Sequence, residues 1–157
     1  MNGRWVVVDG YSVLYAWPGL RKKAGRSLEK QRNALIALLR QYADQTGQRV
    51  TVVFDGYGAK HKPSPAEPVS GVEVVFSESG KTADDSIERL VAQAAQPQQM
   101  VVVTSDNVER QTVEGLGAMS LSAESFEMEC KAVLKELAAQ VRAYGRRRRL
   151  GSLGEQF

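Results

Sequence analysis

Acidic residues in this sequence follow runs of apolar, β-branched residues. Asp9 ends "RWVVVD", Asp55 ends "RVTVVFD", and Asp106 ends "QMVVVTSD". Short apolar runs of this kind predict strands that are buried on both faces. Because ligands of open parallel sheets bind outside the carboxyl ends of the strands, we expect the three carboxylates at one edge of the sheet.

Two further acids, Asp84 and Asp85, fall in the first turn of a predicted helix that has Thr82 as its N-cap. Taken singly, each acid has a structural explanation, since helix N-termini favour negative charge and turns after strands favour aspartate. Taken together, several close carboxylates repel one another unless a cation neutralises them. Mg²⁺ or Mn²⁺ suits such oxygen ligands, and the resulting site activates water for attack on a phosphodiester.

Other α/β chemistries lack their motifs in this sequence. There is no G-x-G-x-x-G and no G-x-x-x-x-G-K-[ST], so no nucleotide cofactor is expected. The segment "DGYSV" lacks the second aspartate of the haloacid-dehalogenase-type phosphatases, which argues against a small phosphatase or phosphotransfer domain. Cys130 is the only cysteine, which rules out an internal disulfide and a cysteine-rich zinc site.

The strands and helices that must position these acids alternate along the chain. Predicted strands cover residues 4–9, 49–55, 71–76, 99–106 and 118–122. Predicted helices lie between Ser27 and Gly47, after Thr82, around 107–114 and near 123–144. This order predicts an α/β three-layer fold with a mainly parallel central sheet flanked by helices. In a chain of 157 residues without a linker, we expect one domain over 1–144 and a basic C-terminal tail over 145–157.

Basic residues gather in three segments of the sequence. They are Arg21, Lys22, Lys23 and Arg26 in a predicted loop after the first strand, Lys60 and Lys62 in a proline-rich loop at 57–69, and Arg146, Arg147, Arg148 and Arg149 near the C-terminus. From Val141 to Phe157, five arginines stand against one acid. A basic tail on a nearly neutral body is typical of proteins that contact RNA phosphates. A solvated end that only keeps the protein soluble explains the tail about as well.

The distribution of apolar residues predicts a soluble, cytoplasmic protein with no membrane partner. No apolar stretch approaches the roughly 20 residues needed to cross a bilayer, and the residues before Asp9 are too few for a signal segment. A single cysteine also fits a reducing compartment.

Four segments together resemble a known family. They are "VVVDGYSVLYAWPGL", "RVTVVFDGY", "GVEVVFSESGKTADDSIERL" and "VVVTSDNVERQTVEGLGAMSLSAESF". In order and spacing they resemble the YacP-like branch of the NYN domains, within the PIN-like ribonuclease superfamily. The resemblance covers about residues 5–135 and implies a PIN-like endoribonuclease with an acidic Mg²⁺ or Mn²⁺ site. It further implies cleavage of messenger RNA in association with ribosomes.

The resemblance also implies roles for individual residues. Asp9, Asp84 and Asp106 match the catalytic, metal-binding acids, and Asp55 matches a supporting metal ligand. The positions implied to orient these groups are Ser12, Asp85, Thr104 and Ser105.

One residue departs from the family pattern. The family's D-G-Y-N reads "DGYS" here, so Ser12 stands where the family has asparagine. Serine offers one rotatable hydroxyl close to the backbone, whereas asparagine offers a donor and an acceptor on a longer side chain. The alternative function is therefore a non-catalytic RNA- or ribosome-binding module on the same fold.

Overall fold

The computed structural model describes residues 3–56, 68–69 and 71–154. Its centre is a six-stranded sheet in the order β3-β4-β2-β1-β5-β6. The strands are β1 Trp5–Asp9, β2 Arg49–Phe54, β3 Pro68–Val69, β4 Val72–Phe76, β5 Met100–Val103 and β6 Met119–Leu121. Every neighbouring pair is parallel except β3 and β4. The predicted mainly parallel sheet is confirmed, while the short edge strand β3 was not predicted.

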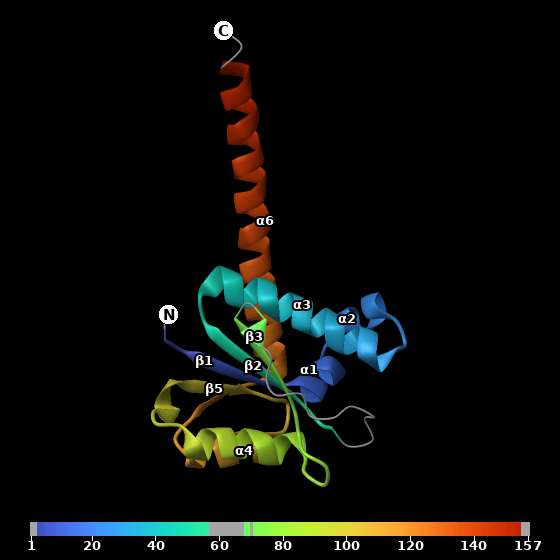
Figure 1. Cartoon of the computed structure of the whole chain (residues 1–157), viewed down its shortest axis with the longest axis vertical. Helices are drawn as coiled ribbons and strands as arrows, with labels where there is room; N and C mark the ends of the chain where they lie inside the picture. The colour runs from blue at the N-terminus through green and yellow to red at the C-terminus, as the bar shows by residue number, and fades with distance from the viewer. Residues whose placement is uncertain (1–2, 57–67, 70, 155–157) are drawn as a thin grey trace.

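Helices cover both faces of the sheet (Figure 1). They are α1 Gly10–Ala16, α2 Pro18–Ala24, α3 Leu28–Thr46, α4 Ala83–Gln93, α5 Asn107–Gly115 and α6 Ala123–Gly154, with a short 3₁₀ helix, η1, at Pro97–Gln99. Successive side chains of β1 point to opposite faces of the sheet, as strand geometry requires. Val6 and Val8 pack with α1, α3 and α6, and Val7 packs with α4 and α5. The three-layer α/β fold is therefore confirmed.

Local signals fix the ends of two helices as predicted. Ser27 caps α3 by accepting a hydrogen bond from the backbone N–H of Lys30, and Gly47 ends the helix in the left-handed conformation at φ 71°. Thr82 and Asp85 form a capping box at the start of α4. These caps set where α4 begins relative to the sheet edge.

The segment between β1 and α3 was wrongly predicted to be a loop. Residues 10–24 form α1 and α2, so Arg21, Lys22 and Lys23 lie on a helix. Asp9 caps α1, and Pro18 at the first position of α2 has the fixed φ that a helix start needs. Trp17 between them is buried in the core, as expected for a large aromatic side chain, and its indole Nε1 donates to the carbonyl of Ala123.

Helix α6 continues to Gly154, so its predicted end near residue 144 is wrong. Arginine and leucine are good helix formers, and one glycine, Gly145, does not stop the helix. The second half of α6 projects from the rest of the molecule (Figure 1). Val141, which continues the apolar stripe of this helix after Phe126 and Cys130, is 62% exposed because nothing in the described part of the chain packs there. Within the same described ranges, no helix is long and apolar enough to cross a membrane.

The strand order places a topological switch point at the centre of the sheet. From β1 the chain builds β2 and β4 on one side, then returns to form β5 and β6 on the other. The carboxyl ends of β1 and β5 therefore border the crevice where ligands of open α/β sheets bind. Asp9 lies at the first of these ends and Thr104 directly follows the second.

Candidate active site

Asp9 ends β1 with its carboxylate held from two sides. It is 7% exposed. Its Oδ1 accepts from the backbone N–H of Ser12 at 3.5 Å, which starts α1, and its Oδ2 accepts from the Thr104 hydroxyl at 3.4 Å. The acid that ends the first apolar run therefore joins the central strand to the segment after β5.

Asp84 reaches the same edge from the first turn of α4. Its neighbour Asp85 forms the capping box, in which Asp85 Oδ2 accepts from the Thr82 N–H at 3.1 Å and Thr82 Oγ1 accepts from the Asp85 N–H at 3.2 Å. Asp85 thus fixes the start of the helix. Asp84, one position earlier, has its carboxylate beside that of Asp9.

The third carboxylate at this edge belongs to Glu109, which the sequence did not reveal as a site residue. Glu109 lies in the first turn of α5 and is 2% exposed. Its Oε2 accepts from the Thr104 hydroxyl at 3.0 Å. One oxygen each of Asp9, Asp84 and Glu109 lie within 4.8 Å of one another, so β1, α4 and α5 each contribute one acid to a compact cluster.

The pKa values of Asp9 and Glu109 are raised in this cluster. Burial raises the pKa of Asp9 to about 6, and repulsion from Asp84 adds to the shift. Burial also raises the pKa of Glu109 to about 10, and repulsion from Asp9 and Asp84 adds to the shift. A divalent cation among these oxygens relieves the repulsion and compensates the loss of hydration.

The donor set fits Mg²⁺ or Mn²⁺. Both ions favour carboxylate oxygens, and the cluster contains only such oxygens. Within the described residues, Glu109 Oε1 is buried and has no hydrogen-bond partner. A buried oxygen in this state is costly unless something binds it, and a metal ion provides that interaction.

Asp106 and Asp55, also predicted to bind metal, lie outside this three-acid cluster in the described structure. Asp106 caps α5, because its Oδ1 accepts from the backbone N–H groups of Val108 at 2.9 Å and Glu109 at 3.3 Å. Asp55 Oδ1 accepts from the Ser77 hydroxyl at 3.4 Å beyond the end of β2. Asp106 therefore sets the direction of Glu109, and a ligand role for either aspartate stays a prediction.

The hydroxyl groups of Ser12, Thr104 and Ser105 connect the elements around the cluster. Ser12 Oγ accepts from the Ser105 N–H at 2.9 Å and lies 2.6 Å from Ser105 Oγ and 3.3 Å from Thr104 Oγ1. Thr104 Oγ1 accepts from the Asp106 N–H at 3.2 Å. Ser12, which departs from the family pattern, thereby ties α1 to the segment after β5.

A cation that the sequence did not point to lies beside the first helix. The Arg32 guanidinium donates to the Tyr11 hydroxyl at 3.1 Å and lies 5.8 Å from the centroid of the Phe76 ring. Tyr11 packs against Phe54, with ring centroids 5.2 Å apart, as expected for a packed aromatic. Among the described residues no carboxylate pairs with Arg32. No sequence signal identifies it, because its position depends on how α3 packs beside α1.

The predicted RNA-binding cations are spread over the molecule. Lys22, Lys23 and Arg26 are exposed on or just after α2, and Arg21 is half-buried. Arg146, Arg147, Arg148 and Arg149 lie on the projecting end of α6. Lys60 and Lys62 lie outside the described residues.

This combination of sheet topology and acidic cluster is that of a PIN-like α/β domain of the ribonuclease type. The family model described as the YacP-like NYN domain matches residues 6–153, and the chain belongs to that family. The resemblance inferred from the sequence motifs is therefore confirmed.

Relatives from one organism agree with this assignment. A protein described as "Uncharacterized protein YacP" from Bacillus subtilis (strain 168) is 36% identical over 139 residues, which cover 87% of this chain and 81% of the relative. The crystal structure of Rae1 (YacP) from Bacillus subtilis matches with a TM-score of 0.76 at 32% identity, covering 95% of this chain and 86% of that chain. A mutant of the same protein matches with a TM-score of 0.73 at 33% identity, covering 90% and 82%.

Proposed function

We propose that this protein is a metal-dependent endoribonuclease that hydrolyses RNA phosphodiester bonds. The observation that carries the proposal is the cluster of Asp9, Asp84 and Glu109, whose oxygens lie within 4.8 Å of one another at the switch point of the sheet. Asp9, Asp84 and Glu109 hold Mg²⁺ or Mn²⁺, which supplies an activated water and stabilises the charge that develops on the phosphate.

The residues around the cluster keep the three carboxylates in place. Thr104 contacts both Asp9 and Glu109 through one hydroxyl group. Asp106 fixes the first turn of α5 and with it Glu109. Partners of this kind orient metal ligands, and their loss typically lowers metal affinity or activity about 10- to 100-fold.

Arg32 and the exposed cations of α2 and α6 bind the RNA backbone. The Arg32 guanidinium is oriented by its hydrogen bond to the Tyr11 hydroxyl. Among the described residues, no carboxylate pairs with Arg32. Its charge is therefore available for a phosphate. The proposed substrate is messenger RNA, cut in the cytoplasm in association with ribosomes, and the support for this finer statement is the family resemblance together with the basic end of α6.

Asp84→Asn should abolish cutting of RNA in the presence of Mn²⁺ or Mg²⁺, as should EDTA. The matched control is Asp44→Asn, which makes the same chemical change at an exposed position on α3. Cleavage products are measured on free RNA and then on messenger RNA in translating ribosomes. Cutting that persists in Asp84→Asn would contradict the metal site, and binding of both RNA samples without any cutting would favour the non-catalytic module.

Replacing Arg146, Arg147 and Arg148 with glutamine should weaken RNA binding and flatten its salt dependence. Glutamine preserves helix propensity, so the change removes charge more than structure. Each lost phosphate contact reduces the slope of log K against log salt by roughly 0.7–0.9. RNA affinity is measured at several salt concentrations in proteins that also carry Asp84→Asn, so that the RNA is not cut. The control is Lys135→Gln, at an exposed position on the part of α6 closer to the sheet. An unchanged slope would mean that this end of α6 does not contact RNA.

A further inference from the structure

A second concave site lies at the opposite edge of the sheet from the carboxylates. The cavity has a volume of about 470 Å³ and includes Trp5, Arg49 and Met100 in its lining. These residues start β1, β2 and β5 and are paired in register across the sheet. Strand β1 runs from this cavity at Trp5 to the acidic cluster at Asp9, a span of roughly 13 Å at about 3.3 Å per residue. The volume is in the range of small-ligand pockets.

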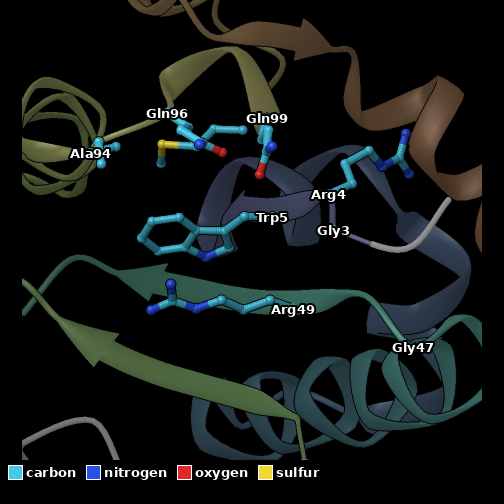
Figure 2. A pocket seen from close by; sticks show the side chains of 10 residues that line it. Gly3, Arg4, Trp5, Gly47, Arg49, Ala94, Gln96 and Gln99 are labelled. Carbon is cyan, nitrogen blue, oxygen red and sulfur yellow. The ribbon is translucent and has the colours of Figure 1, made fainter.

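The Trp5 ring is held rigidly, with one face covered. The Arg49 guanidinium carbon lies 3.7 Å from the ring centroid, and Arg49 Nε is itself fixed by Glu73 Oε1 at 2.7 Å. The indole Nε1 donates to Thr51 Oγ1 at 2.8 Å, so the polar end of the side chain is satisfied. Figure 2 shows Arg49 on one side of the ring and Gln96 and Gln99 on the other. The other side of Trp5 packs in part against the core cluster that includes Met100 and borders the cavity, where the half-buried ring offers a surface for stacking.

Polar groups without partners line the opposite wall. Gln96 and Gln99 are exposed, and among the described residues their side-chain amides have no hydrogen-bond partner. The charges near the cavity are already balanced, because Arg4 pairs with Glu129 at 3.1 Å and Arg49 pairs with Glu73. The described residues of the lining thus offer a π surface and amide donors and acceptors, and both of their charged side chains, Arg4 and Arg49, are paired.

We propose that this cavity binds a nucleobase, stacked on Trp5 and hydrogen-bonded through its edge by Gln99 and Gln96. A flat, uncharged ring with donors and acceptors along its edge matches each of these features, and stacking accepts any base. The base belongs either to a free nucleotide or to an RNA strand. The inference does not rest on the nuclease activity, because it uses none of the acidic residues.

Nuclear magnetic resonance of the full chain tests this site through its two tryptophans. The Asp84→Asn protein is kept in EDTA, so that neither cleavage nor metal-bound phosphate contributes. AMP and a short oligoadenylate are titrated separately while the two indole N–H signals are followed. The Trp5 signal should shift and saturate with a dissociation constant of about 1 mM or tighter. The signal of Trp17, which is 1% exposed, should stay in place.

Two variants at neighbouring positions give a matched comparison. Gln99→Ala should weaken binding about 2- to 10-fold through its lost hydrogen bond, whereas Gln98→Ala, exposed on the same η1 but outside the lining, should leave binding unchanged. Trp5→Leu removes the stacking surface together with the indole signal, so its binding is followed through the side-chain amide signals of Gln99 and should be weakened about 5-fold or more.

The two ligands separate the sources of the base. Equal affinities for AMP and the oligoadenylate indicate a free nucleotide, and a clear preference for the oligoadenylate indicates an RNA strand. The proposal is overturned if neither ligand shifts the Trp5 signal, or if Gln99→Ala and Gln98→Ala bind alike. Base binding at Trp5 is measured without cleavage, so a failure of the proposed nuclease activity would not change this result.

Discussion

Glu109→Gln should lower the rate of RNA cleavage by about 100-fold or more, a barrier increase of roughly 2.7 kcal/mol. Glutamine has the same size as glutamate but carries no charge, so the metal site loses one of its three acids. The rate is measured at saturating Mn²⁺, with Glu124→Gln, an exposed acid at the start of α6, as the control.

The same assay on Asp106→Asn separates two roles at the start of α5. Asparagine caps a helix as well as aspartate does, so the N-cap is preserved. A rate close to that of the unmodified protein would restrict Asp106 to capping, and a loss as large as for Glu109→Gln would make it a further ligand. If instead Glu109→Gln cleaves normally, the site is not the cluster of Asp9, Asp84 and Glu109.

The metal-free protein should lose stability as the pH rises from about 5 to 8, and Glu109→Gln should reduce that loss. The folded-state pKa values of Glu109 and Asp9, about 10 and about 6, lie above the ordinary values of 4.5 and 3.8. The folded state therefore binds more protons than the unfolded state in this window, and its stability falls with increasing pH. For Asp9 the loss is complete once the pH passes about 6, and for Glu109 it continues toward about 10.

Thermal unfolding in EDTA at pH 5, 6, 7 and 8 measures this effect. At pH 8, Glu109→Gln should melt at a higher temperature than the unmodified protein. The difference is about 2–4 °C for each 1 kcal/mol or so of added unfolding free energy. The Glu124→Gln control should follow the unmodified protein. If the melting temperatures of Glu109→Gln and the unmodified protein change with pH by the same amount, ionisation of the buried Glu109 carboxyl group does not destabilise the protein.

Much of the fold follows from signals that are local in the sequence. The apolar runs predicted the parallel strands, and the caps at Ser27 and Thr82 predicted where α3 and α4 begin. Asp9 and Asp84 were predicted as site residues because strand ends and first helical turns face the same edge of a parallel sheet. Both lie in the observed cluster.

Glu109 was missed because its position in the chain has an ordinary explanation. An acid three residues after an N-cap usually returns a hydrogen bond to the cap, as Asp85 does in α4. In α5 the acid turns inward instead, toward Thr104 and Asp9. The available signal was the repeat of an acid in the first turn of α4 and of α5, each of which follows a strand of the parallel sheet. Only tertiary packing separates the inward acid from the capping one.

The ends of the helical regions were missed for a different reason. Residues 10–24 contain Pro18 and two glycines, Gly10 and Gly19, which usually indicate a loop, yet the proline starts α2. From Val141 to Leu150, the described side chains of α6 are mostly exposed, so the apolar pattern gave no information on where the helix stops. The start of α2 and the length of α6 therefore depend on local capping and helix propensity rather than on apolar packing.

Crystals soaked in Mn²⁺ and examined by anomalous diffraction test the central claim most directly. The predicted result is an anomalous peak among the carboxylate oxygens of Asp9, Asp84 and Glu109. The same experiment on Asp84→Asn crystals should show the peak weakened or lost. A protein saturated with Mn²⁺ that shows no peak there, or shows one that Glu109 does not contact, would contradict the account.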